Sequence, residues 1–224
     1  MALASVNGID VVSATICMPL VGAWSATLVV DSPAGVTGAC TLALDGGLTL
    51  VGFAARAGVF LETSYVRITG GGAGGLSKPA RVQHYRGTTV RGVVGELMRT
   101  SGETLSATAD PAVLALQLTA WTQQRQTVRQ ALSSLIEDRR VGAGVSWRVL
   151  PDGTVWIGAE TWPDAGLTAP ADYQELVELP SEGWIDLGSE VPRIAPGVSL
   201  EGRRIGYVEH RVAETVRSRA WMAG

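Results

Sequence analysis

The two histidines, His84 and His210, are the residues on which acid–base or nucleophilic chemistry would have to depend. A Ser-His-Asp or Cys-His site would use one of them, but the sequence contains no G-x-S-x-G motif. His210 follows Glu209 in a strand-like stretch, so the two side chains point to opposite faces and cannot pair directly. We expect a hydrogen-bonded residue at a strand rim, and we predict no catalytic residue.

The cysteines, Cys17 and Cys40, both lie in strand-like runs. Two thiols are too few for a disulfide framework or a zinc site, and no D-x-D-x-D-G loop indicates calcium. We therefore expect buried free thiols and predict no metal and no cofactor.

The carboxylates are spread along the chain. Glu137 and Asp138 lie on a predicted helix and are followed by Arg139 and Arg140, a pattern typical of a solvated helix end. A glycosidase needs two carboxylates that face each other, and no pair can be placed so from the sequence.

Residues 70–75 read GGGAGG and contain the spacing G-x-G-x-x-G at Gly70, Gly72 and Gly75. A dinucleotide site requires a helix to follow, because the pyrophosphate binds at a helix N-terminus. Here Leu-Ser-Lys-Pro and then a strand-like run over 80–86 follow, and no Gly-Lys-Ser/Thr occurs. We predict a flexible hairpin tip rather than a nucleotide site.

Arginines gather near the C-terminus, where they would suit a polyanion. Glutamates are interleaved with them, which favours strand faces of mixed sign, at a subunit contact. The net charge of −3 argues against specific binding of nucleic acid. The arginines are Arg203, Arg204, Arg211, Arg217 and Arg219, and the glutamates are Glu201, Glu209 and Glu214.

The uncharged stretch 11–30 raises the question of a membrane span. Pro19 and Gly22 interrupt it, and Asp10 and Asp31 flank it. The first basic residue is Arg56, so the positive start of a signal peptide is missing. We expect buried strands, no membrane insertion and assembly in a cytoplasm.

The elements that carry the residues discussed above are mostly predicted strands. The chain is predicted to belong to the α+β class, with a majority of β-structure. Residues 1–86 show short strands punctuated by Gly and Pro, typical of a sandwich or a small barrel. Their predicted strands are 25–30, 39–44, 48–54, 59–63 and 65–69.

Residues 87–158 are predicted to form a small α+β unit. One helix covers 89–101, and a short strand contains Leu114. A second helix starts at a capping box of Thr127 and Gln130 and stops at Gly142 and Gly144. A hairpin over 145–157 follows, with a Pro-Asp-Gly turn.

Residues 159–224 are predicted to form a second β region or partial barrel. Its expected strands are 175–179, 197–200, 204–213 and 215–221. The seven tryptophans are scattered along the whole chain, which favours core and interface anchors over a sugar-stacking surface.

The order of these parts resembles the baseplate hub proteins of contractile-tailed bacteriophages and related contractile injection systems. The resemblance covers most of the chain. It is carried by the Gln-Thr-x(4)-Leu-x(2)-Leu helix, a Trp-bearing strand, a Pro-Asp-Gly turn, Val-Trp-Ile-Gly, and the Ile-Gly-Tyr-Val-Glu-His run at 205–210.

The resemblance implies a tail-type N-terminal β-barrel, an α+β insertion and a second, minimal barrel. It also implies a homotrimeric ring in the virion that joins a hexameric tail tube to a trimeric central spike, beside other baseplate proteins, with no catalytic residues. The alternative function is a polysaccharide-degrading or carbohydrate-binding tail protein, which would need a carboxylate pair in a groove or exposed tryptophans.

Overall fold

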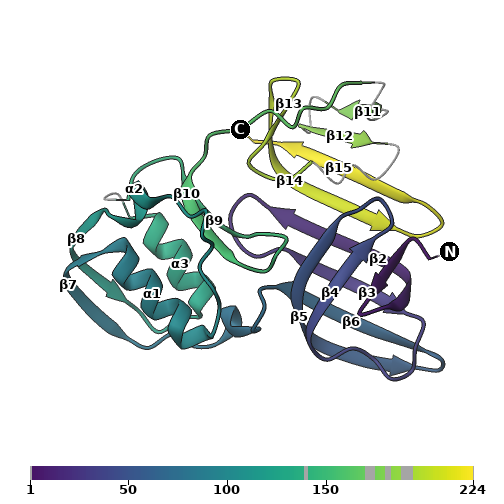
Figure 1. The fold of residues 1–224 in the computed structure, drawn as a ribbon, viewed down its shortest axis with the longest axis horizontal. Coiled ribbons are helices and arrows are strands. Elements are labelled where there is room, and N and C mark those ends of the chain that lie inside the picture. The colour runs from purple at the N-terminus through teal and green to yellow at the C-terminus, as the bar shows by residue number, and fades with distance from the viewer. Residues whose placement is uncertain (1, 139–140, 170–174, 180–182, 188–193, 224) are drawn as a thin grey trace.

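The computed structural model describes the chain except residues 1, 139–140, 170–174, 180–182, 188–193 and 224 (Figure 1). Six strands close an N-terminal barrel in the order β1-β4-β5-β6-β3-β2, and β2 pairs back with β1. These strands are β1 (Ala4–Val6), β2 (Ile9–Pro19), β3 (Ser25–Val30), β4 (Gly38–Leu44), β5 (Thr49–Phe60) and β6 (Thr63–Gly70). The prediction of a mostly β chain with an N-terminal barrel is confirmed.

The barrel strands follow from alternation of buried and outward side chains, as in β3, where every second residue is buried. The strand expected at 25–30 has these bounds. The two strands expected at 48–54 and 59–63 are wrong, because β5 runs unbroken from Thr49 to Phe60. A register shift between Ala54 and Arg56 lets the strand bend while it stays paired with β6.

The middle of the chain contains the helices and two strand pairs, β7 with β8 and β9 with β10. In Figure 1 this part lies to the left of the barrel. Its elements are η1 (Gly75–Ser77), β7 (Gln83–Thr89), α1 (Val90–Ser101), α2 (Pro111–Leu114), β8 (Gln117–Gln123), α3 (Val128–Ile136), β9 (Val145–Val149) and β10 (Val155–Ala159).

The predicted starts of both long helices are confirmed. Thr89 caps α1, and Thr127 and Gln130 form the capping box of α3, with 2.9 Å between the Thr127 amide and the Gln130 Oε1. The predicted end of α3 is wrong. The helix stops at Ile136 with Glu137 as a right-handed cap, and the following glycines lie in the loop beyond it.

The strand expected around Leu114 is also wrong at its start. Asp110 accepts hydrogen bonds from the amides of Ala112 and Val113, and Pro111 occupies the first helical turn. Leu114 therefore ends the short helix α2, and the strand begins only at Gln117.

The C-terminal strands continue the barrel's own sheet, as a barrel-like extension. β14 pairs with β2, from Tyr207 opposite Pro19 to Val212 opposite Ala14, and the order continues through β15 and β12 to β11. The strands are β11 (Glu175–Leu179), β12 (Trp184–Leu187), β13 (Ser199–Leu200), β14 (Arg203–Val212) and β15 (Val216–Met222). The strand β12 was not predicted from the sequence. Part of the predicted second β region lies outside the described residues. The division at 86 and 158 remains a proposal.

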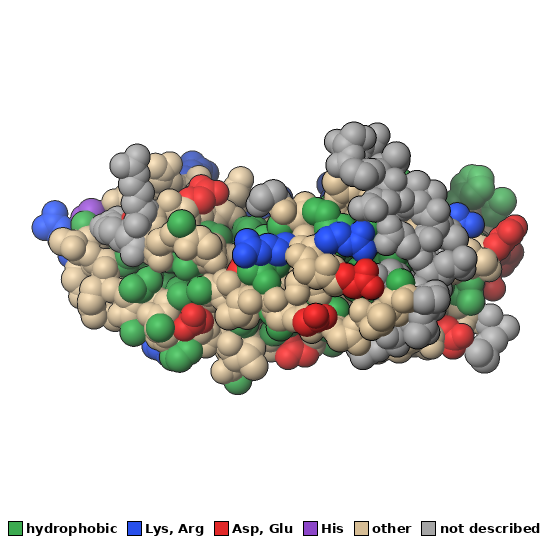
Figure 2. All heavy atoms as spheres, turned by 90° about the horizontal axis from the view of Figure 1, so that it is seen from above, with side chains coloured by type: hydrophobic (Ala, Val, Ile, Leu, Met, Phe, Trp, Pro, Cys, Tyr) green, Lys and Arg blue, Asp and Glu red, His purple; other side chains and the backbone are tan. Residues whose placement is uncertain are grey.

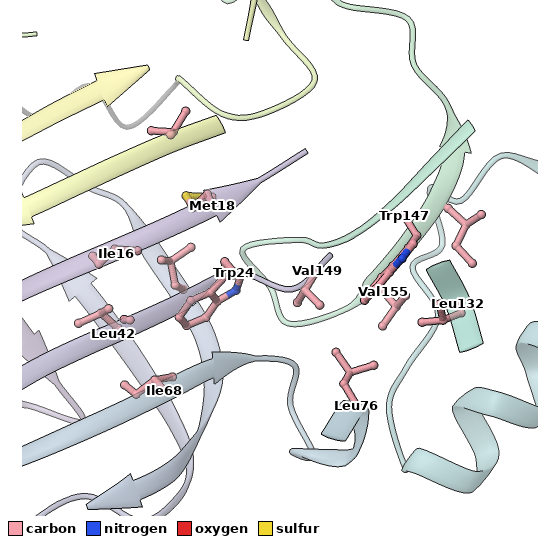
Figure 3. Packing of buried hydrophobic residues seen from close by; sticks show 14 of the residues in the cluster. Ile16, Met18, Trp24, Leu42, Ile68, Leu76, Leu132, Trp147, Val149 and Val155 are labelled. Carbon is pink, nitrogen blue, oxygen red and sulfur yellow. The ribbon is translucent and has the colours of Figure 1, made fainter. Parts of the chain in front are cut away.

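One contiguous hydrophobic core runs through these parts (Figure 3). Trp24 lies in the barrel, and its ring is so close to Gly52 and Gly70 that a Cβ on either would come within 2.7 Å. Beyond it, Leu76 and Trp147 extend the core toward the helices. No helix in the described residues has the length and apolar character needed to cross a membrane.

Candidate functional site

The glycine-rich segment 70–75 is a packed junction between the barrel and η1, so the prediction of a hairpin tip is wrong. The strands on either side, β6 and β7, pair with other strands and not with each other. A Cβ on Gly75 would lie 1.9 Å from the Ser101 carbonyl oxygen, and one on Gly74 would lie 2.6 Å from the Phe53 ring. Glycine is required there because the neighbouring backbone and ring leave no space for a side chain.

The backbone amides of this segment bind a carboxylate of the chain itself. Glu103 is only 7% exposed, and it accepts hydrogen bonds from the amides of Ala73 at 3.2 Å and Gly75 at 2.8 Å. In a dinucleotide fold such amides would face a pyrophosphate. Here the Glu103 carboxylate uses them, which supports the prediction that this spacing is no nucleotide site.

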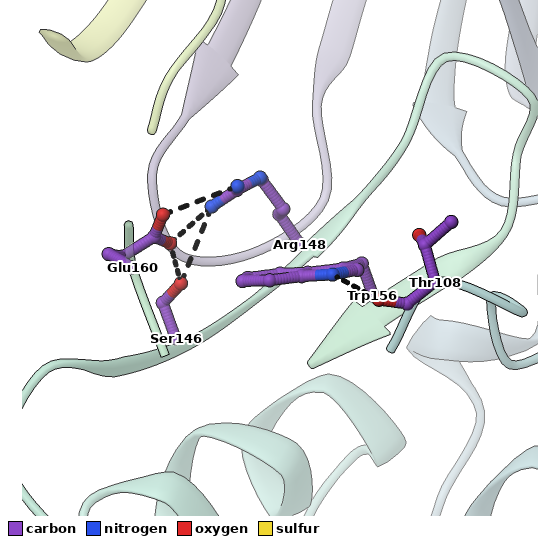
Figure 4. A network of polar contacts seen from close by, with 5 residues as sticks. All are labelled: Thr108, Ser146, Arg148, Trp156 and Glu160. Atoms are coloured by element: carbon purple, nitrogen blue, oxygen red, sulfur yellow. Dashed lines mark hydrogen bonds and ion pairs between the residues drawn. The ribbon is translucent and has the colours of Figure 1, made fainter. Parts of the chain in front are cut away.

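A second buried carboxylate, Glu160, forms the centre of a polar cluster beside the β9–β10 hairpin (Figure 4). It accepts hydrogen bonds from the Ser146 hydroxyl and from both terminal nitrogens of Arg148. The Arg148 guanidinium also lies 4.2 Å above the Trp156 ring, whose Nε1 donates to the Thr108 carbonyl at 3.0 Å. With its lone pairs engaged in this way, Glu160 positions the hairpin and is poorly suited to act as a base.

The same hairpin is bound on both sides. The Gly22 amide donates to the Trp147 carbonyl at 2.7 Å, and the Val149 amide donates to the Gly22 carbonyl at 3.2 Å. On the C-terminal side, a Cβ on Gly197 would lie 2.6 Å from the Arg148 Nη2. β9 therefore contacts the barrel and the loop before β13 together, which makes this cluster a structural clamp.

His210 is completely buried, so the expected position at a strand rim is wrong. Its Nδ1 lies 2.8 Å from the Ser218 Oγ, and its Nε2 has no hydrogen-bond partner among the described residues. Burial lowers the pKa of His210 to about 4. Ser218 is buried as fully, so this serine–histidine pair is closed to any substrate.

His84 is exposed, and its contacts do not form a catalytic arrangement. Its Nδ1 is 2.7 Å from the Thr122 Oγ1, and its Nε2 accepts a hydrogen bond from the Arg86 Nε at 3.2 Å. Neither contact supplies a nucleophile with an orienting carboxylate.

The two cysteines are free thiols, as expected, but only Cys40 is buried, whereas Cys17 is half-buried. Burial raises the pKa of the Cys40 thiol to about 11, so it is a poor nucleophile. The described part of the chain has no cluster of three His, Cys, Asp or Glu side chains that would suit a metal ion.

The C-terminal strand faces carry paired charges of both signs, as predicted. Where the face in Figure 2 is not grey, acidic and basic side chains lie interspersed rather than in a field of one sign. The ion pairs are Arg211 with Glu209 at 2.6 Å, Arg219 with Asp186 at 3.0 Å, and Arg203 with Glu201 at 3.7 Å. Such pairs leave little free positive charge for a polyanion.

The tryptophans are anchors rather than an open stacking surface. Trp24, Trp121 and Trp147 are buried in the core, and the other four are half-buried. Trp221, for example, lies edge-on to Tyr207 with ring centroids 5.0 Å apart.

Four of the seven large apolar side chains that are exposed in the described residues lie on the β5–β6 hairpin, a feature that the sequence analysis did not single out. Val59, Phe60 and Leu61 are 60%, 75% and 79% exposed, and Tyr65 on β6 is 54% exposed. A soluble chain rarely leaves such a group uncovered unless it contacts another molecule. This hairpin is the best candidate for an interaction site.

The architecture was compared with that of known proteins. No protein-family model and no curated protein matches the sequence. Several solved structures do match. One is the 43 kDa tail protein of prophage MuSo2 from Shewanella oneidensis, which has 11% sequence identity and a TM-score of 0.64. The match covers 98% of this chain and 95% of that one. The fold is that of a phage tail protein.

Two further structures agree. A tail protein from Neisseria meningitidis MC58 has 14% identity and a TM-score of 0.61, over 98% of this chain and 95% of that one. The Escherichia coli c3393 protein has 13% identity and a TM-score of 0.68, over 99% of this chain and 77% of that one. It is a component of the type VI secretion system with structural similarity to the T4 tail proteins gp27 and gp5. The resemblance to hub-type tail proteins is thus confirmed for the fold.

Proposed function

We propose that this chain is a structural protein of a phage tail baseplate, or of a related contractile injection system. In this role it forms a homotrimeric hub between the hexameric tail tube and the trimeric central spike. The observation that carries the proposal is the shared fold with tail proteins over nearly the whole chain.

The side-chain geometry supports a non-enzymatic role. The buried carboxylates Glu103 and Glu160 are held by hydrogen-bond donors, and the buried His210 faces no opening. A polysaccharide-degrading enzyme would need two carboxylates across a groove, and a sugar-binding module would need exposed tryptophans. Asp186 and Glu214 do line one pocket, but the Asp186 carboxylate is ion-paired with Arg219 at 3.0 Å and is therefore poorly suited to act as an acid or base.

The proposal includes the place and the partners of the protein. The chain would be assembled in the host cytoplasm and then reside in the virion, at the tail baseplate. Neighbouring subunits together with tube, spike and other baseplate proteins would cover the exposed apolar β5–β6 hairpin and other outward strand faces, as in symmetric assemblies generally.

The experiment is a mass measurement by light scattering at several protein concentrations, followed by mixing with tube and spike proteins from the same tail. We expect a trimer that binds both partners. A protein that stays monomeric and binds neither partner would contradict the hub function.

A further inference from the structure

The β5–β6 hairpin forms an arm that extends past the closed part of the barrel (Figure 1). β4 pairs with β5 only as far as Ala54, and from Arg56 onward the described strand partner of β5 is β6 alone. The tip consists of the exposed Phe60 and Leu61 followed by Glu62. It is thus an apolar end that carries one negative charge.

A pocket whose charge is opposite to that of the arm tip lies on the same molecule, between the barrel wall and α3. This pocket has a volume of about 380 Å³ and is lined by Arg67 of β6, Arg129 of α3, the 43% exposed Val21, and Ser25. Neither guanidinium has an ion-pair partner among the described residues. Two unpaired cations beside an apolar side chain match an apolar segment that bears a carboxylate.

The arm cannot fill the pocket of its own chain. Glu62 and Arg67 are five residues apart along a paired strand, which corresponds to roughly 17 Å. The ladder from Phe60 opposite Thr63 to Arg56 opposite Arg67 keeps the arm extended. An occupant of this kind must therefore come from another molecule.

We propose that the tip of the arm in one subunit docks into the pocket of a second copy of this chain. Glu62 then faces Arg67 and Arg129 of the neighbour, and Phe60 and Leu61 cover Val21. Because the arm and the pocket are different surfaces, the contact is head-to-tail, and it forms the proposed trimeric ring if each subunit is rotated by a third of a turn from the last. This contact rests on the proposed trimeric function and names the surfaces that would form the trimer.

The test is a charge exchange, with light scattering and sedimentation of the full chain over a concentration series. Glu62→Arg and Arg129→Glu should each weaken self-association at least tenfold, and Glu62→Arg combined with Arg129→Glu should restore most of it. Both positions are exposed, so circular dichroism should show the folded state in every variant. Asp45→Arg, in the exposed turn before β5, is the matched control and should associate like the wild type.

The outcomes separate the contact from the function. If the single variants associate as the wild type does, or if the exchange does not restore association, the contact is wrong while a hub assembled through other surfaces stands. If the wild type remains monomeric, alone and with tube and spike proteins, the hub function itself fails, and the contact fails with it.

Discussion

His210 is the residue at which acid should first weaken this protein. His210 lies on β14 between β2 and β15, and its Nε2 has no partner among the described residues, so a proton on that nitrogen would be buried without an acceptor. Burial therefore holds the ring neutral in the folded state, whereas an unfolded chain accepts a proton at ordinary histidine pKa values.

We expect stability to fall as the pH drops from about 6.5 toward 4. In that window the unfolded state binds a proton that the native state, with a pKa of about 4 for His210, does not bind. The loss should be about 1.4 kcal/mol per pH unit, in total about 3 kcal/mol. Urea unfolding at several pH values measures it, and His210→Gln should have a shallower slope. Equal slopes for the two proteins would show that other groups cause the acid sensitivity.

Two glycines should respond to alanine in opposite directions. Gly75→Ala should destabilise the fold by more than about 3 kcal/mol, because the new Cβ would overlap the Ser101 carbonyl oxygen. Gly95→Ala, in α1 with nothing within 4 Å of its Cβ, should stabilise the fold by about 0.5–1 kcal/mol. Thermal and chemical unfolding of both variants provide the measurement. A neutral Gly75→Ala would mean that the junction relaxes easily.

At the scale of elements, the β9–β10 hairpin is held in place by charge as well as by apolar packing. The Arg148 and Glu160 side chains are 17% and 6% exposed, and their pair joins the hairpin to the segment that follows it. A buried pair of this kind favours one arrangement of the hairpin, since any other would leave a charge without a partner.

Glu160→Ala should therefore cost about 3–5 kcal/mol, because it leaves the Arg148 guanidinium buried and unpaired. Arg148→Met combined with Glu160→Leu should recover most of that loss, since the two apolar side chains need no partner. Denaturant unfolding of Arg148→Met, Glu160→Leu and the double variant forms the thermodynamic cycle, and Glu160→Ala is measured beside them. Additive effects in the double variant would show that the two residues do not act as a pair.

At the scale of the whole molecule, the barrel, the helical part and the C-terminal strands share one hydrophobic core. β2 serves both the barrel, through β1 and β3, and the C-terminal sheet, through β14. Removal of any one part would expose apolar surface on the others.

We therefore expect the chain to unfold in a single transition. Tryptophan fluorescence, which reports on all seven tryptophans and among them on the buried Trp24 and Trp147, should coincide with far-UV circular dichroism along a denaturant series. A fluorescence change that precedes the loss of secondary structure would indicate that the parts separate before they unfold.

Local signals in the sequence predicted local structure well. The Thr127–Gln130 capping box, the bounds of β3 and the hairpin around the Pro-Asp-Gly turn depend on neighbouring residues, and all three are confirmed. Asp110 and Pro111 carried a further local signal, a cap followed by proline at the first helical position, which would have predicted α2.

Features that depend on distant residues could not be predicted. The segment 70–75 looks like a flexible loop until Glu103 and Ser101 pack against it. Likewise, the pocket exists only because residues of β6 and α3, distant in the sequence, line it together, so no spacing in the sequence indicates that Arg67 and Arg129 share a site.

The pairing of β14 with β2 also has a mechanical consequence. A pull along the strand axis on the C-terminal sheet would reach the barrel through the ladder from Tyr207–Pro19 to Val212–Ala14. Antiparallel hydrogen bonds lie across the strands, so such a force loads all of them in shear at once and does not open them one by one. Tension would thereby pass between the C-terminal sheet and the barrel directly through paired strands.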